Sequence, residues 1–434
     1  MDFEAAVGYL LSLGHETLTI KLGLRNTELL LAALDNPERA FPSVQIAGTN
    51  GKGSTASMLD SICRAAGINS GLYTSPHLLS ITERIRIGGT SITPEEFASC
   101  ARTVRDLSAQ LLAEKQLEAL PTFFEQLTAI ALLAFRKAGV ELAILETGLG
   151  GRLDSTTAAN ARIVAITPIA LDHEEYLGNT IESIAAEKAA IIRPGVKAII
   201  AKQEPQALKV IMKRCEETEV TPILLDSPHT IETVTADGRF CVSFETAKHR
   251  YKNLCMGLRG RHQIDNAAVA IHIAELLSTI GFTLPRDAIA KGIETATHPG
   301  RLELISHRPS ILIDGAHNPA GARSLRAYLD QFAQRPLTLV FGAMRDKQLE
   351  QMGEILFPVA DALILTTIDN PRSATVDVLQ TIAARFGRGK VLTSESSAVA
   401  LRTAIANTPA EGLICVAGSL YLIGEILPLI SNLS

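Results

Sequence analysis

A glycine-rich loop with one lysine and several hydroxyl groups lies near the start of the chain, in the stretch QIAGTNGKGSTAS (residues 45–57). VQIAG before the loop predicts a strand, and TASMLDSICRAAG after it predicts a helix. Such a turn gathers free backbone N–H groups at the positive end of a helix, which favours phosphate binding over a bare turn with a solvated lysine. Lys52 adds a charge, and Ser54 or Thr55 adds a hydroxyl for Mg²⁺. The spacing differs from GxxxxGK[ST], because Gly53 directly follows the lysine.

Two other strand ends carry groups that suit a metal ion beside a phosphate. The run LAIL ends at Glu146, and Asp172 and His173 follow the strand IVAIT. Beside a phosphate loop, a carboxylate at a strand end is favoured as a metal ligand. For His173, the spacing alone favours a surface or core histidine over a metal ligand. Lys188 lies in the apolar helical stretch IAAEKAAII, where a charged amine is costly unless it is paired, modified or extended to solvent.

The second half of the chain carries another polar cluster after a strand. ILIDGAHNPAG ends an apolar run with Asp314 and continues with His317 and Asn318. Ligands usually bind outside the carboxyl ends of parallel strands, although a helix cap is the alternative for these residues. Arg301, after HPG, could reach a phosphate or could be a surface charge.

These groups need a scaffold, and the predicted elements alternate between strands and helices. We expect strands at 68–75, 140–146, 161–169 and 196–202 and helices at 94–119, 123–138, 181–192 and 263–281. The alternation predicts an α/β fold, with a parallel sheet covered by helices on both faces. A new strand and helix series begins after ETATHPGRLELISHRPS. We therefore expect a P-loop-type ATP-binding domain at 1–297 and a smaller Rossmann-like α/β domain at 298–434.

The composition narrows the classes of function. A net charge of −5 gives no general attraction to nucleic acid or acidic membranes, so we expect neither as a partner. Six cysteines without a CxxC pair or zinc spacing predict free thiols. The start MDFEAAVGYL lacks the features of a signal peptide, and the apolar run LTAIALLAF is shorter than the ~20 residues that span a bilayer. We expect a cytoplasmic protein.

Together the motifs resemble those of the folylpolyglutamate synthase and dihydrofolate synthase family, which is akin to the Mur ligases. The resemblance covers nearly the whole chain, and its motifs include GTNGKGS, TSPHL, ERIRI, TFFEQLT, ETGLGGRLDST, LDHEEYLGNTIESIAAEKAAII, GRHQIDNAAVA, PGRLE, DGAHNP, FGAMRDK and VAGSLYLIGEI. GTNGKGS, with its glycine after the lysine, is similar to this family's own phosphate loop. The sequence departs from the family at His298, where tryptophan is common, and at Thr157, where asparagine is common.

The resemblance implies an ATP-dependent ligase. A substrate carboxylate attacks the γ-phosphate of ATP, and the amino group of L-glutamate then attacks the acyl phosphate. The implied ATP phosphate site is Gly48, Thr49, Asn50, Gly51, Lys52, Gly53 and Ser54. The implied Mg²⁺ ligands are Ser54, Ser75, Glu146 and His173. The implied nucleotide contacts elsewhere are Gln263 and Asn266 on the adenine side and Arg301 and Asp314 from the second domain.

The resemblance also implies roles for the remaining candidates. His317 meets the incoming glutamate and counts with Lys52 and Lys188 as catalytic, and Lys188 falls where the family carries a carbamylated lysine. The implied pterin-substrate contacts are Arg84, Thr122, Phe124 and Asp154, although Asp154 could instead be a turn residue. The expected substrates of this monomer are ATP, L-glutamate, dihydropteroate and folates. A synthase limited to folate polyglutamylation, a Mur-type peptide ligase and an ATP-hydrolysing switch are the alternatives.

Overall fold

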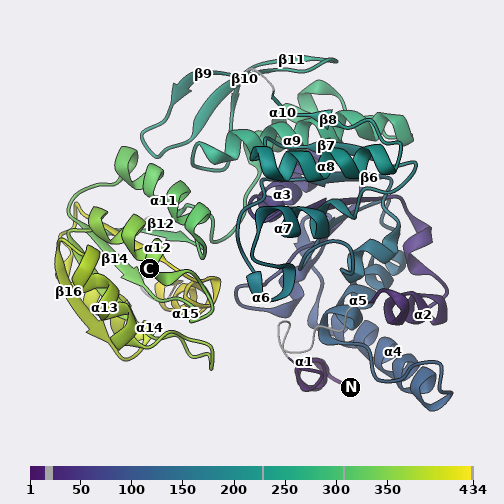
Figure 1. Cartoon of the computed structure of the whole chain (residues 1–434), viewed down its shortest axis with the longest axis horizontal. Helices are drawn as coiled ribbons and strands as arrows, with labels where there is room; N and C mark the ends of the chain where they lie inside the picture. The colour runs from purple at the N-terminus through teal and green to yellow at the C-terminus, as the bar shows by residue number, and fades with distance from the viewer. Residues whose placement is uncertain (15–22, 227–228, 306–307, 432–434) are drawn as a thin grey trace. The chain divides into compact units, whose positions relative to one another are not determined.

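A computed structural model describes residues 1–14, 23–226, 229–305 and 308–431 of the chain (Figure 1). The chain forms two compact units. The first comprises Met1–Pro228, Phe244–Tyr251 and Asp265–Ala296, and the second comprises His229–Ser243, Lys252–Ile264 and Thr297–Ser434. The segments between positions 229 and 264 thus alternate between the units.

The first unit is built on a sheet that has eight strands in the described residues, in the order β4-β3-β2-β5-β1-β6-β7-β8. Its strands are β1 (Ser43–Ala47), β2 (Ser70–Tyr73), β3 (Ile85–Ile87), β4 (Thr90–Ser91), β5 (Leu142–Glu146), β6 (Ile163–Ile166), β7 (Lys197–Ile200) and β8 (Ile223–Leu224). The adjacent strands β2-β5-β1-β6-β7-β8 pair in parallel, as predicted. At one edge of the sheet, β3 pairs antiparallel with β2, and β4 pairs antiparallel with β3. All residues of β1, β5 and β6 are buried, as in a parallel sheet with both faces covered.

The helices of this unit follow the predicted alternation. They are α1 (Phe3–Ser12), α2 (Arg25–Ala33), α3 (Lys52–Ala65), α4 (Pro94–Ala113), α5 (Phe123–Lys137), α6 (Glu174–Leu177), α7 (Ile181–Ala189), α8 (Pro205–Glu217) and α10 (Arg286–Thr295). Short 3₁₀ turns occur at η1 (Pro37–Ala40), η2 (Ile81–Arg84), η3 (Ser155–Ala159) and η4 (Ser278–Ile280). The helix predicted at 94–119 ends earlier, at Ala113, because Lys115 takes a left-handed φ of 59°.

A small sheet of three strands lies in the middle of the sequence, in the order β11-β10-β9. Its strands are β9 (His229–Val234), β10 (Phe240–Glu245) and β11 (Arg250–Cys255), and helix α9 (His262–Leu277) follows. The prediction of six free thiols is wrong for two of them, because Cys241 and Cys255 form a disulfide. Their 14-residue separation gave no signal, since the neighbouring strands β10 and β11 bring them together. The other four cysteines are free and buried.

The second unit contains a sheet with six strands in the described residues, in the order β12-β13-β17-β14-β15-β16. Its strands are β12 (Glu303–Ile305), β13 (Ser310–Asp314), β14 (Leu337–Phe341), β15 (Ala362–Thr366), β16 (Lys390–Ser394) and β17 (Leu413–Ala417). All pairings are parallel except that of β12 with β13. The helices are α11 (Pro319–Phe332), α12 (Leu349–Leu356), α13 (Val376–Phe386), α14 (Ser397–Asn407) and α15 (Leu420–Ser431), and η5 (Phe357–Val359) is a 3₁₀ turn.

The predicted fold class is confirmed: an α/β unit with a largely parallel sheet and a second, separate α/β unit. Among the described residues, no helix combines the length and the apolar character needed to cross a membrane.

Candidate functional site

Four neighbouring strands of the first unit end in the predicted phosphate and metal groups. Strand β1 runs into the glycine loop, β5 ends at Glu146, β2 leads to Ser75, and β6 leads to His173. These strands are adjacent and parallel, in the order β2-β5-β1-β6, so their carboxyl ends lie at the same edge of the sheet. The edge where such ends meet is the usual ligand position in an open α/β sheet.

Two glycines of the loop are required by its close packing. A Cβ on Gly48 would lie 1.9 Å from Thr167 Oγ1, and a Cβ on Gly51 would lie 2.2 Å from Asn266 Oδ1. Gly51 also has a φ of 87°, which strains residues with side chains. Since Gly51 is the N-cap of α3 and has no side chain, the backbone N–H groups around Gly53 receive no side-chain cap from it. Such N–H groups suit an anion.

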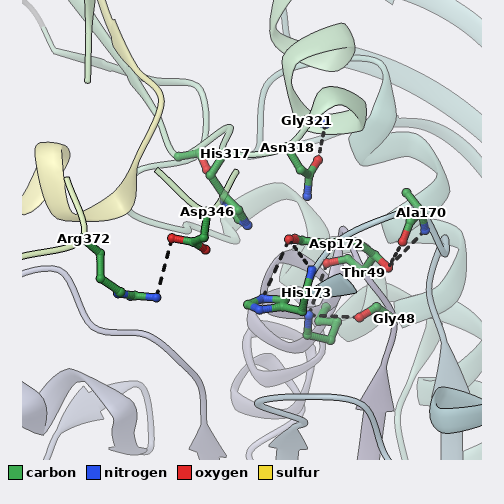
Figure 2. Close-up of polar contacts among 12 residues, drawn as sticks. Gly48, Thr49, Ala170, Asp172, His173, His317, Asn318, Gly321, Asp346 and Arg372 are labelled. Carbon is green, nitrogen blue, oxygen red and sulfur yellow. Dashed lines mark hydrogen bonds and ion pairs between the residues drawn. The ribbon is translucent and has the colours of Figure 1, made fainter. Parts of the chain in front are cut away.

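The loop is fastened to the segment that follows β6 (Figure 2). The backbone N–H groups of Thr49 and Asn50 donate to Pro168 O at 3.0 and 3.2 Å. The Thr49 hydroxyl exchanges hydrogen bonds with the Ala170 carbonyl and N–H at 3.0 and 3.1 Å. These hydrogen bonds hold the phosphate loop against residues 168–170, the segment that leads from β6 to His173.

Two lysine amines meet at the phosphate loop. Lys52 Nζ donates to Gly48 O at 3.1 Å and to Thr49 O at 3.2 Å. Lys188 Nζ, from α7, donates to the same Gly48 carbonyl at 2.8 Å, and its side chain is only 4% exposed, which excludes extension to solvent. Burial, and then the charge of Lys52, lower the pKa of Lys188 to about 7, although Asp172 and Asp154 oppose this shift. A large share of the Lys188 amine is therefore neutral at physiological pH.

Two of the predicted metal ligands, Ser75 and Glu146, are in contact, and metal binding by the set stays a prediction. Ser75 N donates to Glu146 Oε2 at 3.2 Å, and both Glu146 and Ser54 are buried. His173 has a left-handed φ of 52°. Its backbone N–H donates to Asp172 Oδ1 at 2.9 Å, and the same oxygen lies 4.0 Å from His173 Nε2. In the described part of the chain, no three His, Cys, Asp or Glu side chains gather to hold a metal alone. This donor set fits Mg²⁺, which keeps water and phosphate oxygens as ligands.

Asp154 is fully engaged by its own loop. Its Oδ2 accepts from the N–H groups of Gly148 and Leu149 at 2.8 and 2.9 Å, and its Oδ1 accepts from the N–H and hydroxyl of Thr156. Burial raises the pKa of this carboxyl, and the four donors oppose the shift. Asp154 therefore has the turn role that the sequence left open. Its contact with a pterin stays a prediction.

Thr122 and Phe124 begin α5 beside this loop. Thr122 caps the helix: its N–H donates to Glu125 Oε2 at 2.7 Å, and its hydroxyl receives the Glu125 N–H at 3.4 Å. The half-buried Phe124 ring lies 5.9 Å from the Tyr73 ring, and a Cβ on Gly148 would meet its Cζ at 2.4 Å. The helix start thus presents an aromatic face next to the Asp154 loop.

Arg84, one of the predicted substrate contacts, is buried and not exposed to solvent. Its Nε donates to His77 Nδ1 at 2.7 Å, and its guanidinium lies 5.6 Å from the centre of the Phe123 ring. The structure brings it close to the start of α5, but its side chain packs in the protein interior. A direct role in substrate binding stays a prediction.

In the second unit, Asp314 arranges the loop after β13. Its oxygens accept the N–H groups of Leu302 and Ala316, both at 2.9 Å. Burial raises its pKa, and the charge of Arg301 opposes the shift most. A Cβ on Gly315 would lie 2.0 Å from Arg301 Nη1, so the missing side chain leaves room for the guanidinium. Arg301 and Asp314 therefore lie near each other, and their contact with a nucleotide stays a prediction.

His317 and Asn318 follow in the same loop. Asn318 caps α11 through the Gly321 N–H at 2.8 Å, and His317 Nδ1 lies 2.8 Å from Gly315 O. Asp346 Oδ1 lies 3.9 Å from Arg372 Nη1, in the loops after β14 and β15. The dashed line between them in Figure 2 marks this ion pair. Neither residue was among the candidates predicted from the sequence. The arginine in IDNPRS after an apolar strand was the signal that could have found it.

The two adenine-side candidates lie three positions apart on α9. Gln263 and Asn266 are both buried, and Asn266 is the residue that abuts Gly51 of the phosphate loop. Gln263 Nε2 lies 3.2 Å from His262 Nε2. Burial, and then Arg301, lower the pKa of His262 to about 4, so its imidazole is neutral.

The whole chain is similar to known ligases. The Mur ligase middle domain matches residues 46–274, and the Mur ligase glutamate ligase domain matches residues 300–420. The chain is 36% identical over 389 residues to the dihydrofolate synthase/folylpolyglutamate synthase of Mycobacterium tuberculosis, covering 86% of this chain and 80% of that protein.

Solved structures agree with this similarity. E. coli FolC in complex with DHPP and ADP has a TM-score of 0.88 and 30% identity, over 100% of this chain and 98% of that one. A bifunctional folylpolyglutamate synthase/dihydrofolate synthase with Mn, AMPPNP and L-glutamate bound has a TM-score of 0.85 and 28% identity, over 99% and 98% of the two chains.

Proposed function

From the premise that this chain belongs to the Mur ligase family, in its dihydrofolate synthase and folylpolyglutamate synthase branch, we propose that it is an ATP-dependent ligase that adds L-glutamate to 7,8-dihydropteroate and to reduced folates. One observation carries the proposal: a phosphate loop with two lysines, a carboxylate and a histidine follow the ends of neighbouring parallel strands. This arrangement suits phosphoryl transfer, which depends mainly on positioning and charge neutralisation.

The first chemical step forms an acyl phosphate. The loop N–H groups and Lys52 hold the ATP phosphates while an oxygen of the substrate carboxylate attacks the γ-phosphorus, and ADP leaves. Ser54, Ser75, Glu146 and His173 would hold Mg²⁺, which would supply positive charge beside the phosphates. In the second step the glutamate amine attacks the acyl carbon, loses a proton, and inorganic phosphate leaves. The product contains a new amide bond.

We assign Lys188 a modified form. A neutral amine adds CO₂ and releases a proton, and the resulting carbamate is an anion. The burial of Lys188 and its lowered pKa of about 7 supply the neutral amine. A carbamate would also replace a buried positive charge beside Lys52 by a negative one, which removes a repulsion and favours the metal.

We propose that residues 298–434 form the glutamate-ligase domain. Arg301 and Asp314 act toward the nucleotide, and His317 toward the incoming glutamate. The Asp346 and Arg372 pair offers opposite charges for an amino acid that carries both an ammonium and carboxylates. Action as a cytoplasmic monomer without a nucleic-acid partner also stays a prediction.

Removal of a metal ligand should raise the metal requirement. Glu146→Gln and His173→Ala each lower kcat by about 100-fold and shift the Mg²⁺ concentration for half-maximal rate upward, since few protein ligands hold the ion. ADP release measured against Mg²⁺ concentration checks this. Glu174→Gln, next to His173 on the same turn, is the matched control. Parent-like Mg²⁺ titrations of both variants would show that Glu146 and His173 are structural.

The experiment that tests the function is ADP release with different acceptors. We expect ADP release with dihydropteroate plus L-glutamate and with tetrahydrofolate plus L-glutamate, and little ADP when either the pterin substrate or L-glutamate is left out. Turnover with tetrahydrofolate but not with dihydropteroate, each in the presence of L-glutamate, would reduce the protein to a polyglutamylating enzyme. ADP release that ignores both substrates would instead indicate an ATP-hydrolysing switch, and the ligase assignment would be wrong.

The Asp154→Ala variant tests whether Asp154 takes part in the reaction with dihydropteroate. Asp154→Ala should lose the dihydropteroate reaction by roughly 100-fold, the scale of a charge-assisted hydrogen-bonding group worth about 3 kcal/mol. The rate with dihydropteroate, relative to the parent, is the measurement. An unchanged rate would leave Asp154 with its turn role only.

A further inference from the structure

A fully buried amide lies beneath the loop that holds Asp154. Gln45 is in the middle of β1, and its side chain is 0% exposed. Its Nε2 donates to Thr156 Oγ1 at 3.0 Å and to Thr157 Oγ1 at 2.8 Å. Both hydrogens of this amide therefore point at one short segment, more than a hundred positions away along the chain.

The hydroxyls of Thr156 and Thr157 accept from the Gln45 amide and donate to other groups of the loop. Thr156 Oγ1 donates to Asp154 Oδ1, and Thr157 Oγ1 donates to Gly151 O at 2.7 Å. Each hydroxyl has a single hydrogen, which is committed to the loop, so each can only accept from Gln45. A reversed amide would present its oxygen to both hydroxyls and draw their hydrogens away from Asp154 and Gly151. The amide orientation and the loop conformation are thus coupled.

This series of hydrogen bonds leads from Gln45 through Thr156 to the carboxylate of Asp154, which in turn holds Gly148 beside the Phe124 ring. Asp154 receives four hydrogen bonds, from two groups of Thr156 and from the N–H groups of Gly148 and Leu149. These four hydrogen bonds hold the carboxylate in the loop, and they oppose the rise in its pKa that burial causes. Gly148 is in turn the residue against which the tip of the Phe124 ring lies.

We propose that Gln45 is a positioning residue for the ring-bearing end of the substrate: through Thr156 and Thr157 it sets the 148–157 loop, and through Gly148 the place of the Phe124 ring. The inference rests on the proposed function for the identity of that substrate, a pterin. Gln45 itself is fully buried and acts only through the loop. Thr157 Oγ1 is the second acceptor of the Gln45 amide.

The test compares hydroxyl removal with hydroxyl retention. Thr156→Val keeps the side-chain shape and removes the link between Gln45 and Asp154, whereas Thr156→Ser keeps the link. Gln45→Met removes both donors at similar volume. We expect Thr156→Val and Gln45→Met to raise the KM for dihydropteroate about tenfold or more, the scale of one or two lost hydrogen bonds. The KM for ATP stays within about twofold of the parent, and Thr156→Ser restores the parent KM for dihydropteroate.

Controls separate this effect from a general loss of structure. Thr218→Val removes another buried hydroxyl, which bonds to Arg214 O at 2.8 Å at the end of α8, and should leave the KM for dihydropteroate unchanged. Equal losses in both KM values, or a Thr156→Ser variant as poor as Thr156→Val, would overturn the positioning role. If Gln45→Met fails to fold, the Thr156 pair still decides the question. Failure of the parent to use dihydropteroate would refute the dihydrofolate synthase part of the proposed function, a result distinct from any variant-to-parent ratio.

Discussion

Lys52→Ala is expected to lower kcat for ligation by about 100-fold to 1,000-fold, the effect of removing one preorganised group that stabilises charge in the transition state. Lys52 is half-buried at the first position of α3, and its amine spans the loop to Gly48 O and Thr49 O. The side chain contributes charge at the phosphates and little to the core. The fold, measured by thermal unfolding, should therefore remain. ADP release under saturating substrates is the measurement.

The matched control for this variant is Lys197→Ala, which removes an exposed lysine at the start of β7 in the same unit. Its turnover should equal that of the parent. A Lys52→Ala enzyme with near-parental turnover would show that the glycine loop does not hold the transferred phosphate.

Lys188→Ala is expected to be nearly inactive, with a loss of about 100-fold or more, because the buried group that supplies the carbamate is gone. Short carboxylates added to the solution should restore part of the activity, since they can supply the missing anion in the space left by the side chain. Lys188→Arg should stay inactive, because it restores only a positive charge. Turnover of the two variants with and without acetate is the measurement.

The pH dependence gives an independent check of the Lys188 modification. Burial lowers the pKa of the unmodified amine to about 7, so the amine is mainly neutral above this pH and mainly protonated below it. Only the neutral amine takes up CO₂. Enzyme depleted of CO₂ should therefore regain activity on bicarbonate addition at pH 8 and much less at pH 6. A fully active Lys188→Arg variant would contradict the carbamate assignment.

The groups at the strand ends could be predicted from sequence because local patterns specify them. The apolar run of β5 ends at a carboxylate, Glu146, which the local sequence shows directly. The glycines of the phosphate loop mark a strand-to-helix turn without reference to the rest of the fold. The parallel pairing then brings these strand ends to one edge, where Ile46 is opposite Glu146 and Ala47 is opposite Ile166.

The partners of these groups could not be predicted, because they come from distant segments. The contact of Lys188 with Gly48 spans 140 positions, and that of Gln45 with Thr156 spans 111. The disulfide between Cys241 and Cys255 depends on the pairing of two strands, which a 14-residue separation does not reveal. Asp154 illustrates the same limit: its sequence context fitted a turn or a ligand contact, and only the folded loop shows which donors surround it.

Dihydropteroate that carries heavy oxygen in its carboxylate tests whether ATP activates this carboxylate for attack by glutamate. Because attack on the γ-phosphorus transfers one carboxylate oxygen to the departing phosphate, we expect one heavy oxygen atom in each inorganic phosphate released, together with one ADP and one new amide bond. Released phosphate without heavy oxygen, whose fourth oxygen came from water, would show that ATP is hydrolysed separately from amide formation, and the acyl-phosphate mechanism would be wrong.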